Sequence, residues 1–458
     1  MATYEELRRR HIADAAAMMP EMLARIEWSA DQIAGHRRAE LRRLVKTARQ
    51  QSPWHRKRLS AVDLDALDAT NLAELPTMTK DDVMEHWDEI VTDDRLRLDD
   101  AEAHLDGLAA DAYLLDRYHV VSTGGTTGRR GVFVYDWDGW TTCWWSVMRF
   151  EARARRRHPE LAAAPAVGAT VLSQSARHIS SSIVQTFSTG DTEWHRFPVT
   201  LPMAEIVAGL NACQPTVLIG YPSALHPLVH EAETGRLRIF PRSILTSGEP
   251  LLAEIRTALE ATWGAAVVNA YGSTEIGIHA GCGESAGLHL SEDLAIVELV
   301  DVAGRPVPTG VRSDKIFMTN LYNHALPLIR YEITDELTAV DEPCPCGSAF
   351  RRVGDPHGRL DDTFRYDGGV VVHPHVFRSP LGRCRPVVEY KVRQTARGAA
   401  IVVRATDAFD GEALAADIAA GLARLGIANP EVTVAAVDRL DRQYSGKLKR
   451  FVPLAAGG

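Results

Sequence analysis

The feature that most constrains the fold is an alternation of strand and helix signals in the middle of the chain. Residues 214–233 (QPTVLIGYPSALHPLVHEAE) predict a strand, a Gly-Tyr-Pro break and a helix. Residues 242–277 (RSILTSGEPLLAEIRTALEATWGAAVVNAYGSTEIG) predict a strand, a turn, a helix, a second strand and a polar turn. Strands that alternate with helices favour a largely parallel sheet flanked by helices. Ligands bind such sheets beyond the carboxyl ends of the strands, where both polar turns fall.

The segments on either side of this core have different patterns. The part before about Leu75 has apolar residues at helical spacing, and Leu294 to Val340 reads as short strands between turns, which predicts a small β subdomain. After GRLDD (358–362), two strand-like segments, a helix and another strand predict a compact α+β unit. The predicted fold class is therefore α/β. A large N-terminal domain (1–360) has mostly parallel sheets, flanking helices and the β subdomain, and a small α+β C-terminal domain (361–458) follows.

Composition excludes several classes of function. The 458 residues are 45% apolar and 24% charged, as in ordinary globular proteins. A net charge of −9 argues against nucleic acid as a partner, because phosphate binding needs a basic field. No apolar run approaches the length that spans a bilayer, and the charged N-terminus lacks the apolar core of a signal peptide. Six scattered cysteines do not make a disulfide framework, so we expect a cytoplasmic protein with reduced thiols and no membrane partner.

A loop rich in Gly and Thr is the first candidate binding site. Residues 121–136 read VSTGGTTGRRGVFVYD, and such a loop has little side chain to pack. Its backbone N–H groups and hydroxyls are free to hold a compact anion, as anion-binding nests do. By itself the loop is equally typical of a surface turn, and it is not a Walker loop, because no Gly-Lys-Ser/Thr closes it.

Four more segments follow this loop in order along the chain. They are NAYGSTEIG (269–277), LPLIRYEITDE (326–336), GRLDD (358–362) and YSGKLKRF (444–451). Together with the loop they resemble the adenylate-forming superfamily of acyl-CoA synthetases, peptide-synthetase adenylation domains and luciferases, and within it the phenylacetate–CoA ligase branch. Weaker similarities in QQSPWHRKRL, LPTMTKDDV and LTSGEPL extend the likeness to most of the chain.

The resemblance implies an AMP-forming acid ligase that activates a carboxylic acid, an aryl acid in this branch, with Mg·ATP. A carboxylate lacks a leaving group, and transfer of AMP from ATP supplies one with release of pyrophosphate. This chemistry needs a metal and cations to shield the phosphates. The resemblance further implies coenzyme A as the acyl acceptor and a homodimer.

Other functions would leave the same adenylation motifs. The acceptor could be a carrier protein or an amine instead of coenzyme A, and the substrate could be an oxygen acid other than a carboxylic acid. A nucleotide-binding regulatory protein without catalysis is a further alternative. Such a protein would be expected to lose its lysine and its metal-binding carboxylate first, and this chain has both.

By resemblance, the phosphates of ATP lie on the loop rich in Gly and Thr. The matching residues are Ser122, Thr123, Gly124, Gly125, Thr126, Thr127 and Gly128. The lysine often found beyond this loop is absent, and Arg129 and Arg130 are candidate substitutes. The turn in LTSGEPL supplies three further candidate cofactor contacts, Gly248, Glu249 and Pro250.

The segment AYGSTE matches the family's adenine and metal contacts. The resemblance places the ring of Tyr271, with Gly272, against adenine, and it places Thr274 at the α-phosphate. Glu275 matches the ligand of Mg²⁺, a hard cation that prefers carboxylate and phosphate oxygen. The resemblance therefore implies catalytic roles for Thr274 and Glu275.

The last motifs match ribose-binding, hinge and catalytic positions. Asp335 matches the carboxylate that accepts hydrogen bonds from the ribose, although Thr334 stands before it where the family usually has Gly. Arg359 is expected near the ribose, and Asp361 matches the hinge about which the C-terminal domain swings between two half-reactions. Lys447 matches the catalytic lysine that bridges the carboxylate and the α-phosphate. The resemblance thus implies a mobile C-terminal domain.

A separate group of residues has the composition of a metal site. Cys282 and His289 lie seven residues apart, and Cys344 and Cys346 form a tight Cys-x-Cys before a glycine. Three thiols and one imidazole suit tetrahedral Zn²⁺, and four protein ligands leave no open position, so the predicted zinc is structural. The alternative is a set of ordinary reduced thiols with a nearby histidine.

Overall fold

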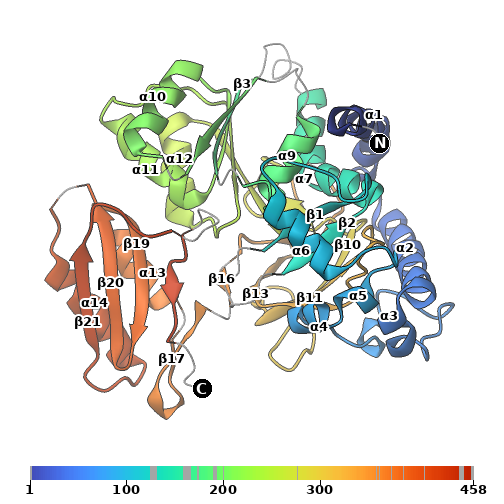
Figure 1. Ribbon diagram of the computed structural model, residues 1–458. Helices are drawn as coiled ribbons and strands as arrows, with labels where there is room; N and C mark the ends of the chain where they lie inside the picture. Colours follow the sequence, from blue (N-terminus) through green and yellow to red (C-terminus); the bar gives the residue numbers. More distant parts are fainter. Residues whose placement is uncertain are drawn as a thin grey trace.

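The computed structural model describes most of the chain. The described residues are 3–123, 131–157, 167–172, 175–188, 193–199, 201–275, 277–356, 358–359, 362–372, 374–384, 386–406, 408–442 and 448–454. They form a large part (the described residues up to 359) and a C-terminal part (the described residues from 362 to 454) that lie side by side (Figure 1). No helix within these ranges is long and apolar enough to cross a membrane.

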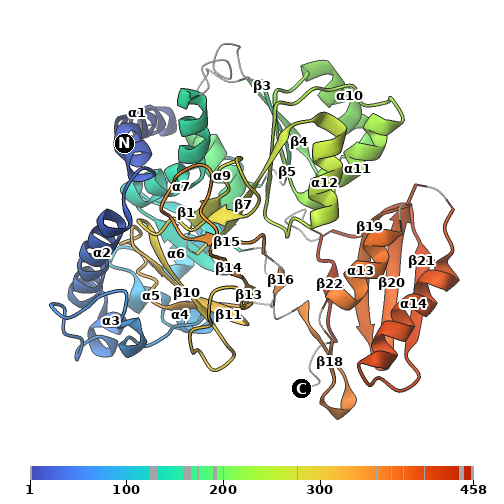
Figure 2. The same cartoon turned by 180° about the vertical axis from the view of Figure 1, so that it is seen from behind.

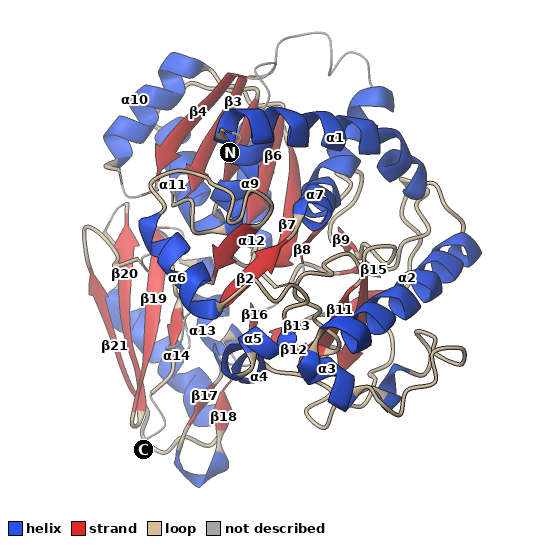
Figure 3. Ribbon diagram, turned by 45° about the vertical axis from the view of Figure 1, so that its right-hand side comes forward, coloured by secondary structure: helices blue, strands red, loops and turns tan. Residues whose placement is uncertain are grey.

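A nine-stranded mixed sheet of described residues forms the centre of the large part (red in Figure 3). Its strands are β3 (Val167–Leu172), β4 (Glu193–Pro198), β5 (Val217–Gly220), β6 (Ser243–Ser247), β7 (Ala266–Ser273), β8 (Gly277–Ala280), β9 (Leu288–His289), β14 (Ala339–Val340) and β15 (Arg352–Val353). The strand order is β14-β15-β9-β8-β7-β6-β5-β3-β4. The half from β4 to β7 is parallel, as predicted, and the half from β7 to β14 is antiparallel. The antiparallel half begins where a tight turn joins β7 to β8, since such a turn can join only antiparallel strands.

Helices cover both faces of the parallel half (Figures 1 and 2). They are α10 (Met203–Cys213), α11 (Pro222–Glu233) and α12 (Ala253–Trp263) on one side, with α7 (Trp137–Arg157) and α9 (Ile179–Phe187) on the other. Helix α11 begins with Pro222 in its first turn, where the missing N–H costs nothing. Helix α12 ends at Gly264, whose φ of 61° is the left-handed conformation that lets the chain turn back into β7. The predicted strand–turn–helix units are therefore confirmed.

The N-terminal part is helical, as its periodicity predicts. The helices are α1 (Tyr4–Arg25), α2 (Ala30–Gln51), α3 (Pro53–Arg58), the 3₁₀ turn η1 (Leu72–Glu74), α4 (Lys80–Glu85), α5 (Trp87–Ile90) and α6 (Leu98–Gly107). Capping boxes start α1 at Thr3 and α2 at Ser29, where each hydroxyl accepts from a free N–H of the first turn.

Small sheets complete the large part. A hairpin pairs β1 (His119–Ser122) with β2 (Val132–Tyr135), and an antiparallel sheet holds β10 (Ala295–Val300), β11 (Lys315–Asn320) and β12 (Tyr331–Ile333). Strand β13 (Asp335–Glu336) pairs with β16 (Gly358–Arg359). The sheet of β10, β11 and β12 lies within the segment for which a β subdomain is predicted.

The C-terminal part has its own sheet, helices and core. It contains β17 (Phe364–Arg365), η3 (Asp367–Gly369), β18 (Val371–Val372), α13 (His375–Arg383), β19 (Val387–Thr395), β20 (Gly398–Ala405), α14 (Gly411–Arg424), β21 (Glu431–Ala436) and β22 (Phe451–Val452). The four-stranded order is β21-β20-β19-β22, and α13 and α14 lie on one face of it (Figures 1 and 2). One buried cluster joins residues from Phe364 to Phe451. The division of the chain at 360/361 stays a prediction.

Candidate functional site

The β1–β2 hairpin closes the base of the loop rich in Gly and Thr. The Thr123 N–H donates to the Gly131 carbonyl (3.0 Å), and the Gly131 N–H donates back to Thr123 Oγ1 (3.0 Å). Ser122 is buried, and its N–H donates to the carbonyl of Arg177 (2.8 Å). The predicted phosphate contacts between these ends lie outside the described residues; they are Gly124, Gly125, Thr126, Thr127 and Gly128, followed by Arg129 and Arg130.

A lysine that the sequence analysis did not single out lies at this base. Lys80 is the first residue of α4, in the segment LPTMTKDDV. Its Cε lies 3.2 Å from the position that a Cβ on Gly131 would occupy. The resemblance of this segment to the family was the available signal, but only the fold shows that it brings a cation beside the loop.

Tyr271 and Asp335 meet directly. Tyr271 lies in β7, and its hydroxyl donates to Asp335 Oδ2 at 2.8 Å. The two side chains are 64 residues apart in sequence and are both buried, with 8% and 5% of their surfaces exposed. The structure therefore joins the predicted adenine contact to the predicted ribose contact. Thr334 does not have the positive φ that would require glycine, so its β-branched side chain is tolerated before Asp335.

The turn that carries Thr274 and Glu275 is held by surrounding side chains. Tyr135 Oη donates to the Thr274 carbonyl (2.8 Å), and Asn320 Nδ2 donates to the Glu275 carbonyl (3.5 Å). Burial raises the pKa of Tyr135 well above its ordinary value, so the phenol stays a donor. Gly277 ends the turn with a φ of 79° and packs so closely on Tyr322 that a Cβ would clash. The Glu275 side chain, half-buried, thus follows the end of β7 on a fixed backbone.

The turn Gly248–Pro250 contacts the C-terminal part. Gly248 has a φ of 76°. Glu249 accepts from the N–H (3.1 Å) and the hydroxyl (3.0 Å) of Ser223, and from the N–H of Leu448 (2.8 Å). Leu448 directly follows Lys447, which lies outside the described residues, as does the predicted hinge residue Asp361. Arg359 pairs through its backbone with Asp335 between β13 and β16, and its side chain is not described.

The four predicted zinc ligands converge. One donor atom from each of Cys282, His289, Cys344 and Cys346 lies within 4.8 Å of the others. Cys282 Sγ is 3.5 Å from Cys344 Sγ, and Cys346 Sγ is 3.5 Å from His289 Nε2. Hydrogen bonding, first from Cys346, lowers the pKa of the Cys282 thiol and favours a thiolate. The donor set fits a tetrahedral site for a borderline-soft cation.

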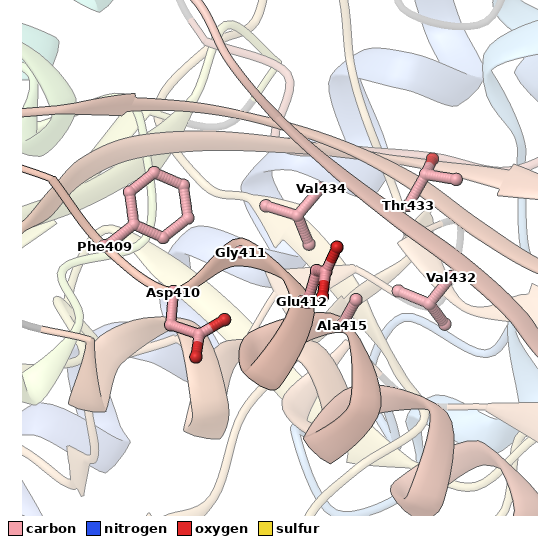
Figure 4. Close-up of a pocket in the computed structure, with 8 residues that line it drawn as sticks. All are labelled: Phe409, Asp410, Gly411, Glu412, Ala415, Val432, Thr433 and Val434. Carbon is pink, nitrogen blue, oxygen red and sulfur yellow. The ribbon is translucent and has the colours of Figure 1, made fainter.

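A groove on the C-terminal part contains none of the predicted site residues (Figure 4). It lies between the start of α14 and β21 and is lined by Phe409, Asp410, Gly411, Glu412, Ala415, Val432, Thr433 and Val434. The Asp410 carboxylate accepts from the Ala413 N–H (2.8 Å), so this residue serves as a helix cap.

Comparisons with known proteins agree with the sequence resemblance. The family model described as AMP-binding enzyme matches residues 189–314. The phenylacetate-coenzyme A ligase of Thermus thermophilus is 36% identical over 131 residues, which span 28% of this chain and 29% of that protein. The phenylacetate-coenzyme A ligase of Pseudomonas putida is 26% identical over 374 residues, 77% of this chain and 75% of that protein.

Solved structures share the fold over most of the chain. A 2-hydroxyisobutyryl-CoA ligase in its postadenylation state is similar with a TM-score of 0.71 at 18% identity, covering 93% of this chain and 90% of that one. The same enzyme in its thioesterification state gives a TM-score of 0.58 at 19% identity, covering 93% and 91%. The likeness thus includes both the large part and the C-terminal part.

Proposed function

We propose that this chain is an adenylate-forming ligase that activates a carboxylic acid with ATP and transfers the acyl group to coenzyme A, a proposal supported by its similarity to known ligases. The observation that carries the proposal is the buried hydrogen bond between Tyr271 and Asp335. This bond joins two motifs that are distant in sequence. Tyr271 lies in β7, and the turn with Glu275 follows that strand. Similarity to phenylacetate-coenzyme A ligases supports an aryl acid as the substrate.

The proposed reaction has two steps, transfer of AMP to the carboxylate and transfer of the acyl group to coenzyme A. A carboxylate oxygen attacks the α-phosphorus of ATP, the bond to the β-phosphate oxygen breaks, and pyrophosphate leaves. The thiol of coenzyme A then loses its proton and attacks the acyl carbon, and AMP leaves with the electron pair of the mixed anhydride. Both steps concentrate negative charge, so fixed cations and dipoles lower their barriers.

The residues divide this work by position. The loop after Ser122 binds the β- and γ-phosphates through N–H groups and hydroxyls, and Lys80 adds a positive charge at its base. Tyr271 lies against adenine, and Asp335 accepts from the ribose. Thr274 and Glu275 hold the α-phosphate and Mg²⁺, whose charge shields the phosphates when it is bound. Lys447 bridges the reacting oxygens during adenylation.

The Cys/His group binds a structural zinc ion in this proposal. Its four donors come from the turn after β8, from β9 and from the loop before β15. A single tetrahedral ion would tie this loop to the antiparallel half of the sheet, and its four protein ligands exclude substrate from the metal.

Pyrophosphate release from Mg·ATP across aryl and short-chain acids tests the function. We expect release with one class of acid, trapping of the adenylate by hydroxylamine, and thioester formation on addition of coenzyme A. Both Lys447→Ala and Glu275→Ala should lower adenylate formation by at least about 100-fold, as loss of transition-state charge stabilisation does. An unchanged rate in Lys447→Ala would remove that residue from catalysis. If the adenylate reacted with a carrier protein or an amine but not with coenzyme A, coenzyme A would be the wrong acceptor.

A further inference from the structure

The two parts of the molecule meet at an interface built around Arg442. Its Nη1 donates to Ser223 Oγ (3.0 Å) and its Nη2 to the Ser223 carbonyl (3.4 Å), at the start of α11. Its Nη2 also pairs with Glu389 of β19. Both charged side chains are largely buried, with 12% and 7% of their surfaces exposed. Nearby, His226 Nδ1 of α11 lies 3.1 Å from the carbonyl of Val388.

Ser223 connects Arg442, through Glu249, to Leu448, the residue that follows Lys447. Its hydroxyl accepts from Arg442 and donates to Glu249 Oε1, and the same carboxylate oxygen accepts from the Leu448 N–H. The chain of bonds therefore runs from Glu389 through Arg442, Ser223 and Glu249 to Leu448. It starts and ends in the C-terminal part and crosses the large part between.

Each group in this series of hydrogen bonds has the donor or acceptor that its position requires. The Ser223 hydroxyl has one proton, with which it donates a hydrogen bond to Glu249, and its oxygen accepts from the guanidinium of Arg442. Charge-assisted bonds of this kind, largely removed from water, are stronger than bonds between neutral groups. A planar guanidinium can serve Ser223 and Glu389 at once, which a lysine ammonium on a single stem does less well.

We propose that Arg442 is a positioning residue that holds Leu448, the residue after Lys447, against the large part during adenylation and releases it for thioester formation. This inference rests on the proposed function. Lys447, the proposed catalytic lysine, directly precedes Leu448 in the sequence, so the hydrogen bond to the Leu448 N–H is made at the next residue of the chain.

Separate measurement of the two half-reactions in Arg442→Ala tests this role. We expect adenylation to fall about 10-fold, a usual size for coupling between two conformations, while thioester formation from added acyl-AMP is unchanged or faster. Arg442→Lys should restore part of the adenylation rate. The variant should fold, because Arg404 Nε still donates to Glu389 (2.7 Å) and Arg442 lies outside the strands and helices of the C-terminal part.

Arg397→Ala is the matched control. It removes the same charge from an exposed pair with Glu431 inside the C-terminal part, so both half-reactions should keep their rates. An equal fall in both half-reactions of Arg442→Ala, or no fall in either, would overturn the proposal, since a merely structural role does not favour one step.

Amide hydrogen exchange at Leu448 gives a readout that does not depend on catalysis. We expect faster exchange in Arg442→Ala than in Arg397→Ala, because Ser223, whose hydroxyl donates to Glu249, loses its bonds to Arg442. Unchanged exchange at Leu448 would contradict the holding role. If the wild-type protein formed no adenylate with any acid, the proposed function would fail, and the exchange rates would still decide whether Arg442 holds this segment.

Discussion

At the scale of single residues, the pairing of Tyr271 with Asp335 is the contact that most shapes the candidate site. A buried carboxylate is costly unless it is hydrogen-bonded, and the Tyr271 hydroxyl supplies one such bond at 2.8 Å. The bond also sets the direction of the phenol ring beside the predicted adenine position. One hydroxyl thus orders the ring predicted to lie against the base and the carboxylate predicted to bind the ribose.

Tyr271→Phe should therefore weaken ATP binding more than it slows the chemical step. Loss of a hydrogen bond to a charged group costs about 1.5 kcal/mol, so we expect the KM for ATP to rise about 10-fold with kcat changed much less. The measurement is pyrophosphate release as a function of ATP concentration, together with calorimetric ATP binding.

Tyr366→Phe serves as the comparison for this variant. Its hydroxyl donates to the Gly398 carbonyl (2.8 Å) within the core of the C-terminal part, so its removal costs stability and leaves ATP binding alone. Equal KM values for ATP in Tyr271→Phe and the wild type would show that the phenol does not organise the nucleotide site.

At the scale of elements, the antiparallel half of the sheet supports both the candidate active site and the Cys/His group. Strands β7 and β8 flank the turn of Glu275, and β8 leads into Cys282. Strand β9 contributes His289, whose ring stacks on Phe150 of α7 at 5.1 Å. The stability of this half therefore bears directly on the geometry of the turn.

Zinc removal should loosen this half of the sheet. We expect about one Zn²⁺ per chain by elemental analysis, and its loss in Cys346→Ser together with a lower unfolding temperature, because a tetrahedral structural site stabilises the fold only with all its ligands. Cys213→Ser is the control, since this half-buried thiol lies outside the group. A metal content unaffected by Cys346→Ser would rule out the proposed ligand set.

At the scale of the whole molecule, buried imidazoles join the N-terminal helices to the rest of the chain. His11 of α1 contacts Thr141 Oγ1 of α7 (2.7 Å), and His55 Nε2 of α3 contacts the Pro327 carbonyl (2.9 Å). Burial lowers the pKa of His11 to about 3 and that of His55 to about 4. Both rings are therefore neutral in the folded protein at pH values where the unfolded chain protonates them.

Stability should consequently fall as pH drops below the ordinary histidine pKa. Each ring contributes fully to the free energy of unfolding above about pH 6.5. This contribution is lost progressively as the pH falls toward the pKa of the ring in the folded protein, and the loss is about 2 kcal/mol per ring at about pH 5. Thermal unfolding between neutral and mildly acidic pH measures the effect. His55→Gln should reduce the fall in unfolding temperature toward acidic pH. His86→Gln, at a ring that is 41% exposed, should leave that fall unchanged. An identical fall in all three proteins would contradict the assignment.

The sequence by itself determined the fold class and the local elements, and it carried the family resemblance. Apolar periodicity and Gly or Pro breaks predicted the β5–α11 and β6–α12–β7 units and the strands and helix of the C-terminal part, because these signals act over a few neighbouring residues. Motif order gave the resemblance to adenylate-forming enzymes, and the similarity to the AMP-binding enzyme model, to phenylacetate-coenzyme A ligases and to a solved CoA ligase agrees with it. The residue types in the sequence also indicated the four members of the Cys/His group, although their spacing alone could not show that they meet.

Only the tertiary structure decided which of these residues touch. The partners Tyr271 and Asp335, Glu249 and Leu448, and Ser223 and Arg442 are separated by 64, 199 and 219 residues. Such contacts depend on strand order, on the antiparallel extension from β8 to β14, and on how the two parts dock. These depend on packing and hydrogen bonding across the whole chain, which no short window of sequence contains.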